Sequence, residues 1–200
     1  EGNLVPVYRE VIADLETPVS AFLKVREGPY SFLLESVEGG ERLARYSFIG
    51  TQPYRVLRTG PGEEYDGDPL VPLEEELNRF KSVAVDGVPA FTGGAIGYVA
   101  YDAVRHWEPR VSREQADVLG IPESMFFFCD CLVVFDHLRH TIKVIAHCRL
   151  DGDIDASYHN AAFQIDTVVK RLANPLKPPI EEVGAVLRGG GKAASNVGRE

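Results

Sequence analysis

The chain has 200 residues, of which 44% are hydrophobic and 26% charged, and its formal net charge is −9 at pH 7. This composition is typical of a globular protein, and the length is sufficient for one large domain. The basic residues form no cluster, which excludes a nucleic-acid partner, and no apolar run approaches the ~20 residues of a membrane span. There is also no basic start followed by an apolar signal core. Three cysteines, an odd number, favour a reducing cytoplasmic location over a disulfide framework.

The first elements of the chain are predicted to be an edge strand and a short helix. The segment 4–10 has strand character, but Pro6 lacks a backbone N–H and excludes a central position in a sheet. Thr17 is a good N-cap residue, and Pro18 suits the first helical position because its missing N–H needs no partner there.

Two strands are expected next, over residues 30–36 and 45–50. The side chains of the first strand alternate between two faces, both of which carry apolar residues, so we expect this strand to be covered on both sides. Glu35 and Ser36 end the strand with one polar group on each face. Two interpretations are open: the pair ends the strand at water, or it belongs to a binding site.

The middle of the chain contains a strand over 54–59, a helix over 73–83 and a glycine-rich stretch over 91–108. Glu74, Glu75 and Glu76 are expected to favour the amino end of the helix through its dipole. The glycines do not have the spacing of a dinucleotide-binding loop, so we interpret them as allowing a strand to approach another backbone closely. A helix over 98–107 is expected to follow.

The most apolar run, 124–135, is predicted to be one strand of a β-hairpin whose second strand covers 141–148. Cys129 and Cys131 lie within this run. A metal site is a weak interpretation because there is no second cysteine pair, and buried free thiols explain the two residues better.

A helix over 155–172 is predicted to bury one side chain per turn, and the prolines that follow Asn174 end it. The buried positions expected on this helix are Tyr158, Ala162, Ile165, Val169 and Leu172. Strands and helices do not alternate regularly, which argues against a parallel sheet. The fold class is therefore predicted as α+β, with an antiparallel, sandwich-like sheet and flanking helices, forming part of a larger two-layer β-sandwich.

Two motifs give the chain a family resemblance. The letters LLES at 33–36, followed by EGGERLARYSFIG at 38–50, resemble the amino-terminal region of anthranilate synthase component I. The letters GGAIGYVAYD at 93–102 resemble a segment that this family shares with the aminodeoxychorismate synthases. The resemblance implies an enzyme of tryptophan biosynthesis that converts chorismate to anthranilate and is inhibited by tryptophan.

The same resemblance implies which residues bind the inhibitor. In this family the LLES segment forms part of the allosteric tryptophan site, so Glu35 and Ser36 are assigned to L-tryptophan binding. Arg45 corresponds by position to a basic residue near that pocket. Ser20 lies in a segment that the family places near the pocket and is a secondary candidate, but ordinary helix packing explains this residue better.

The resemblance also implies a domain division and a set of partners. Residues 1–174 correspond to the amino-terminal regulatory domain, and 175–200 to a linker toward a chorismate-binding domain beyond this chain. That domain carries the catalytic groups of the family, so we expect no catalytic residue, no metal site and no turnover in residues 1–200. In the complete subunit we expect Mg²⁺, chorismate and a glutamine amidotransferase subunit. Aminodeoxychorismate synthase component I and a non-catalytic docking module for a glutaminase remain alternatives.

Overall fold

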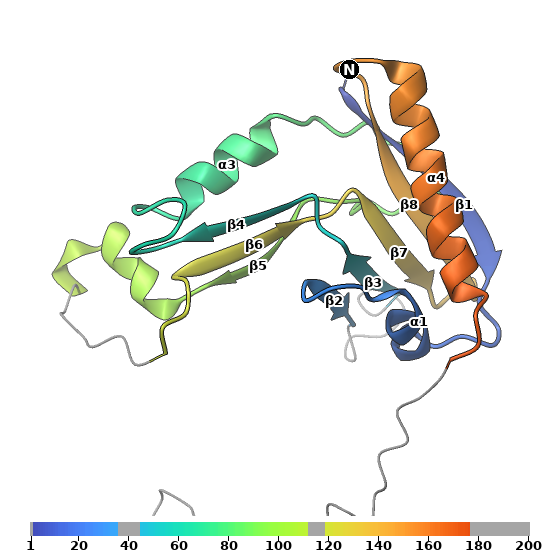
Figure 1. The fold of residues 1–200 in the computed structure, drawn as a ribbon, viewed down its shortest axis with the longest axis horizontal. Coiled ribbons are helices and arrows are strands. Elements are labelled where there is room, and N and C mark those ends of the chain that lie inside the picture. Colours follow the sequence, from blue (N-terminus) through green and yellow to red (C-terminus); the bar gives the residue numbers. More distant parts are fainter. Residues whose placement is uncertain (1, 36–44, 112–118, 177–200) are drawn as a thin grey trace, which may run out of the picture.

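Two antiparallel β-sheets form the framework of the chain, and the computed structural model describes residues 2–35, 45–111 and 119–176 of it. The larger sheet has five strands in the order β1-β8-β7-β3-β2, and each neighbouring pair is antiparallel. Figure 1 shows this sheet beside the helices that cover it. Its strands are β1 (Leu4–Ile12), β2 (Ser31–Leu34), β3 (Tyr46–Thr51), β7 (Cys131–Asp136) and β8 (Thr141–Arg149).

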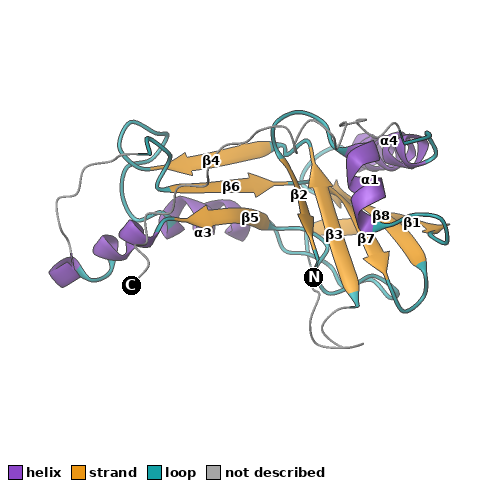
Figure 2. Ribbon diagram, turned by 90° about the horizontal axis from the view of Figure 1, so that it is seen from below, coloured by secondary structure: helices purple, strands orange, loops and turns teal. Residues whose placement is uncertain are grey.

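The smaller sheet has three strands in the order β4-β6-β5 and extends away from the larger one (Figure 2). Its strands are β4 (Arg55–Thr59), β5 (Ala95–Val99) and β6 (Ser124–Phe128). The helices are α1 (Pro18–Val25), α3 (Leu70–Asn78) and α4 (Ile154–Leu172), with 3₁₀ turns η1 (Tyr101–His106) and η2 (Pro109–Val111). The α+β class with antiparallel sheets and flanking helices is confirmed.

The helices α1 and α4 pack on one face of the five-stranded sheet and form the main core with it (Figures 1 and 2). The predicted cap of α1 is confirmed, because Thr17 Oγ1 accepts the backbone N–H of Ser20 and the Ser20 hydroxyl accepts that of Thr17. The buried stripe of α4 differs from the predicted one at several positions, and it consists of Ala161, Ile165, Val168 and Leu172.

The opposite face of the five-stranded sheet is covered by the loop between α3 and β5. Val88 and Phe91 of this loop pack on a second cluster, in which Phe48 and Phe91 meet edge to face at 5.1 Å between ring centroids. The other members of the cluster come from β2, β3, β7 and β8 and from the residue after β6: Phe32, Tyr46, Leu132, Val134, Ile145 and Cys129. Apolar side chains therefore cover both faces of β2, as the alternation predicted.

The helix α3 covers one face of the three-stranded sheet (Figure 1), where Leu73 packs on Leu57, Phe126 and Phe128. The other face is only half-buried. Cross-strand pairing places two rows of side chains on it: Val56, Phe127 and Ile96 in one row, and Arg58, Met125 and Tyr98 in the next.

The apolar run 124–135 is not one strand, contrary to the prediction. It divides into β6 of the smaller sheet and β7 of the larger sheet, and the chain passes between the sheets at Cys129 and Asp130. A carboxylate in the middle of an apolar run marks this passage. The hairpin of β7 and β8 is confirmed, and β1 is the edge strand that Pro6 predicted.

Two helix predictions were wrong in their bounds. Tyr98 and Val99 continue β5, which pairs with β6, and only a 3₁₀ turn follows. Gly97 makes this pairing possible, since a Cβ there would lie 1.8 Å from the Met125 carbonyl oxygen. Helix α3 begins at Leu70, so the glutamates expected at its amino end lie beyond the first turn. None of the helices in the described parts of the chain has the length and apolar character to cross a bilayer.

Candidate functional site

The strand pair β2–β3 brings two of the sequence-predicted site residues to one end of the larger sheet. Leu34 pairs with Phe48 in the antiparallel register, so Glu35 follows β2 at the same end at which Arg45 precedes β3. Glu35 is exposed. Ser36, the third predicted residue, lies outside the described residues.

Arg45 is held by a buried carboxylate. Its Nε and Nη2 donate to the two oxygens of Asp136 at 3.1 and 2.6 Å, and its guanidinium lies 4.8 Å from the Tyr46 ring centroid. Asp136 also accepts the backbone N–H groups of Leu138 and Arg139, so it closes the turn between β7 and β8. Burial opposes ionisation of Asp136, but these hydrogen bonds outweigh it and hold its pKa below the ordinary value.

Ser20, the secondary candidate, is used by its own helix. Its hydroxyl donates to Glu16 at 2.6 Å and accepts the backbone N–H of Thr17. These bonds complete the cap of α1, so the structure gives Ser20 a local role.

A polar pocket lies where the chain passes between the two sheets, and we call it the junction pocket. Its volume is about 170 Å³. The chain passes between the sheets twice, from β3 to β4 and from β6 to β7. These two passages lie side by side, because the Tyr54 N–H donates to the Phe128 carbonyl at 2.8 Å. Strand β8 is joined to the second passage by a hydrogen bond from the His147 N–H to the Asp130 carbonyl at 3.1 Å. The residues that line the junction pocket come from these two passages and from α3, β1, β8 and the loop before β5. They are Leu4, Tyr54, Glu76, Leu77, Phe80, Ser82, Thr92, Gly93, Gly94, Phe128, Cys129, Asp130, His147 and Arg149.

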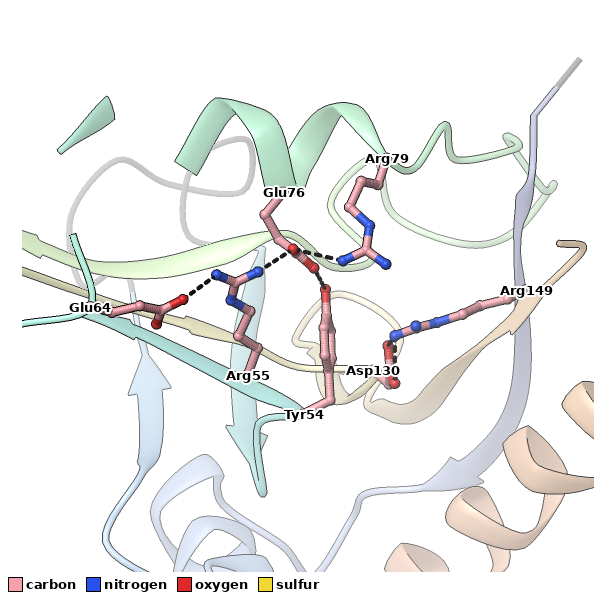
Figure 3. A network of polar contacts seen from close by, with 7 residues as sticks. All are labelled: Tyr54, Arg55, Glu64, Glu76, Arg79, Asp130 and Arg149. Atoms are coloured by element: carbon pink, nitrogen blue, oxygen red, sulfur yellow. Dashed lines mark hydrogen bonds and ion pairs between the residues drawn. The ribbon is translucent and has the colours of Figure 1, made fainter. Parts of the chain in front are cut away.

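Glu76 of α3 is the most buried carboxylate of the junction pocket, with a side chain only 2% exposed. Arg55 and Arg79 donate to its Oε2 at 2.6 and 2.9 Å, and the Tyr54 hydroxyl donates to Oε1 at 3.3 Å (Figure 3). Burial would raise the pKa of Glu76, but the two guanidiniums outweigh it, and the pKa is below the ordinary value. Glu76 is therefore ionised and ties α3 to β4.

Arg149 also lines the junction pocket, and Asp130 is its partner (Figure 3). Its Nη2 donates to the two carboxylate oxygens at 2.9 and 3.1 Å. The guanidinium also lies 4.7 Å from the Tyr54 ring centroid and 4.8 Å from that of Phe80. This pair fixes the end of β8 against the passage from β6 to β7.

The uncharged polar side chains that line the junction pocket are those of Tyr54, Ser82, Thr92 and His147. Burial, followed by the charges of Glu76 and Asp130, raises the pKa of Tyr54 to about 12, so the phenol stays protonated. Burial lowers the pKa of His147, and its Nε2 lies 3.3 Å from the Thr92 hydroxyl oxygen. The imidazole is therefore neutral at pH 7.

Sequence reasoning did not find the junction pocket. Its residues come from distant segments with no common motif, and each of them has an ordinary local interpretation. Asp130 within an apolar run was the one visible signal, since a buried charge requires a partner.

The thiols are free, as predicted, and two of them lie at this passage. Burial raises the pKa of Cys129 and of Cys131 to about 12 in each case, which leaves them as protonated, weakly reactive thiols. Among the described residues, no group of three or more His, Cys, Asp or Glu side chains is placed to hold a metal ion.

Comparison with known proteins places the chain in a family. A sequence model of the family described as "chorismate binding enzyme" matches residues 29–187. The probable anthranilate synthase component 1 of Schizosaccharomyces pombe is 44% identical over 203 residues, which cover 100% of this chain and 40% of that relative. Anthranilate synthase component 1 of Acetivibrio thermocellus is 38% identical over 181 residues, which cover 85% of this chain and 36% of the relative.

A solved structure has a similar arrangement. The crystal structure of anthranilate synthase component I from Streptococcus pneumoniae matches with a TM-score of 0.56 and 27% identity, covering 83% of this chain and 37% of that one. The chain therefore belongs to the chorismate binding enzyme family. Within that family it is a homologue of anthranilate synthase component I, and it spans about 40% of the length of the Schizosaccharomyces pombe relative.

Proposed function

We propose that this chain is the regulatory, amino-terminal part of an anthranilate synthase component I that acts in tryptophan biosynthesis. The observation that carries the proposal is the 44% identity to a probable anthranilate synthase component 1 along the whole chain. Residues 1–174 would form the regulatory domain, and 175–200 the linker to a chorismate-binding domain. The free thiols agree with a reducing cytoplasmic setting.

We further propose that Glu35, Ser36 and Arg45 contribute to a feedback site for L-tryptophan. Glu35 and Arg45 lie at one end of the β2–β3 pair, and their opposite charges suit the ammonium and the carboxylate of an amino acid. Leu34, which is 43% exposed, and the half-buried Tyr46 give the same end apolar surface for an indole ring. Arg45 would have to share its guanidinium between the ligand and Asp136.

The complete protein would need partners beyond these residues. The relatives are named component 1, which favours a second component, and we propose a glutamine amidotransferase subunit that supplies ammonia. Chorismate and Mg²⁺ would bind in the remainder of the protein. The described residues do not form a metal site, and we assign no step to Mg²⁺ on this chain.

A product assay tests the proposed reaction. The complete subunit, given chorismate, Mg²⁺ and an ammonium salt, is expected to form fluorescent anthranilate, and residues 1–200 alone are expected to form none. Accumulation of aminodeoxychorismate by the complete subunit would favour the alternative synthase. Steady anthranilate formation by residues 1–200 would show that the chemistry lies within this chain and would overturn the proposed division of labour.

A further inference from the structure

The junction pocket has the size of a small-molecule site. A cavity of about 150 Å³ holds one benzene ring in a protein interior, and the junction pocket has about 170 Å³. Its apolar walls are formed by Leu4, Leu77, Phe80 and Phe128. Ser82 and Gly94 are exposed, and they mark the side on which the pocket meets solvent. One aromatic ring with a short substituent fits this space.

The charges of the junction pocket are already paired. Figure 3 shows three guanidiniums and three carboxylates joined by ion pairs, namely Arg55 with Glu64 and Glu76, Arg79 with Glu76, and Arg149 with Asp130. An anionic ligand would compete with Asp130 for Arg149, and a cationic ligand would compete with two arginines for Glu76. Glu76 is only 2% exposed, and Asp130 and Arg149 are 24% and 31% exposed, so a charged ligand would give up part of its hydration where the charges are already balanced, which is costly. Ligand charge is therefore disfavoured.

The uncharged groups, in contrast, can recognise a hydrogen-bonding ligand. His147 is 7% exposed and Thr92 is 9% exposed, and both line the junction pocket. A neutral imidazole offers one donor and one acceptor nitrogen, and a hydroxyl can both donate and accept. Tyr54 also lines the junction pocket, and its hydroxyl, which donates to Glu76, can still accept a hydrogen bond. A ligand with one O–H or N–H group can be satisfied here without disturbing an ion pair.

We propose that the junction pocket binds a small, neutral, single-ring aromatic molecule that carries one O–H or N–H group. The ring packs between Leu77, Phe80 and Phe128, and the polar group bonds to Thr92 or His147. The site is separate from the tryptophan site proposed above, because it lies beside α3 and the end of β8 and not at the end of the β2–β3 pair. The two proposals therefore fail independently.

Ligand-observed NMR on the 200-residue chain tests the ligand class with four probes that share one ring. Phenol is expected to bind saturably. Benzene is expected to bind roughly fivefold more weakly, the worth of about one hydrogen bond. Benzoate and benzylammonium are expected to show no saturable binding. Binding of either ion as tightly as phenol would overturn the neutral class, and failure of both neutral probes to bind would overturn the site.

Two matched variants test the location. Ser82→Trp places a large side chain at the mouth and is expected to abolish phenol binding, whereas Ala84→Trp, at an exposed position two residues away that does not line the pocket, is expected to leave it unchanged. Unchanged phenol affinity in Ser82→Trp would refute the proposed location.

A conservative variant tests the polar contact in case the tryptophan substitutions disturb folding. Thr92→Val keeps the shape of the side chain and removes its hydroxyl, so the preference for phenol over benzene is expected to fall at least twofold. Thermal unfolding of each variant verifies the fold. A preference that stays at the wild-type value in Thr92→Val, and likewise in His147→Phe, would show that neither group contacts the ligand and would overturn the proposed recognition.

Discussion

Glu76 explains at the level of one residue how α3 is fixed on the smaller sheet. Its buried carboxylate accepts hydrogen bonds from Arg55, Arg79 and Tyr54, and each of these donors is more exposed than Glu76 itself. A buried charge with several donors is stable in place, and removal of that charge weakens the hydrogen bonds that hold α3 on β4.

The substitution Glu76→Gln is expected to lower the free energy of unfolding by about 1–3 kcal/mol, because two guanidiniums lose a charged acceptor in a desolvated place. Glu64→Gln is the matched control. It removes the other partner of Arg55, but that carboxylate is 55% exposed. Its cost is expected to be near the ~0.5 kcal/mol of an exposed pair. Urea unfolding measures both values, and equal costs would contradict a special role for Glu76.

The pH dependence of stability follows from the same residue. The pKa of Glu76 is lower in the folded protein than its ordinary value of 4.5, so the unfolded chain binds more protons in acid. The contribution of ionised Glu76 to the free energy of unfolding is complete above pH 4.5, and it is lost as the pH falls through the pKa of Glu76 in the folded protein. The free energy of unfolding is therefore expected to fall below this pH, and less steeply in Glu76→Gln. Parallel curves for the two proteins would show that Glu76 contributes nothing to the slope.

At the scale of elements, the close pairing of β5 with β6 depends on Gly97. A Cβ at this position would overlap the Met125 carbonyl oxygen at 1.8 Å, and that oxygen belongs to the backbone and cannot rotate away. Gly97→Ala is therefore expected to destabilise the fold by about 1–3 kcal/mol, the usual cost of overpacking. Hydrogen exchange should also become faster in β5 than in α4.

Gly152→Ala is the control for this change, since no heavy atom lies within 4 Å of a Cβ built there. Its effect on stability is expected to stay within about 0.5 kcal/mol. Equal stability of the Gly97 and Gly152 variants would mean that β5 can move away from β6 without cost.

The elements show which parts of the fold local sequence could predict. The edge strand β1, the cap of α1, the strands β2 and β3, the β7–β8 hairpin and helix α4 all depend on local patterns, and each was predicted. The division of residues 124–135 was missed because both halves are equally apolar, and only tertiary pairing assigns β6 and β7 to different sheets. The helix expected over 98–107 failed because pairing with β6 overrides helical spacing.

The candidate sites also show that local sequence patterns predict only what lies within one segment of the chain. Glu35 and Arg45 were found from one continuous motif, and their common end of the sheet follows from the hairpin register. The junction pocket joins α3, β1, β8 and both passages between the sheets, so its members become neighbours only after folding. Among them, Asp130 alone departed from its local pattern.

At the scale of the whole molecule, the half-buried face of the three-stranded sheet is important. Phe127, Met125 and Ile96 lie on the side away from α3, and Tyr98 on the same side is 38% exposed. An apolar sheet face of this kind is usually covered by another layer. We propose that the complete protein supplies this layer, which would make the chain part of the larger two-layer sandwich that the sequence predicted.

The proposed feedback control can be measured in the complete protein. Tryptophan inhibits only if it binds the inactive state better than the active one, a coupling typically worth ~1–3 kcal/mol. The loss of one hydrogen bond that leaves a buried partner unsatisfied costs about the same, ~1–3 kcal/mol. A substitution at Ser36 can therefore remove the whole regulatory effect, and if the catalytic groups lie beyond this chain it leaves turnover intact.

The most direct test is the inhibition constant for tryptophan, measured together with turnover, in the full-length Ser36→Phe variant. We expect inhibition to be lost while turnover stays near the wild-type value, because the phenyl ring fills the proposed pocket. Ala84→Phe, which places the same ring at an exposed loop position, is expected to change neither value. Unchanged tryptophan inhibition in Ser36→Phe, or a loss of turnover with inhibition intact, would contradict a tryptophan site at the end of the β2–β3 pair.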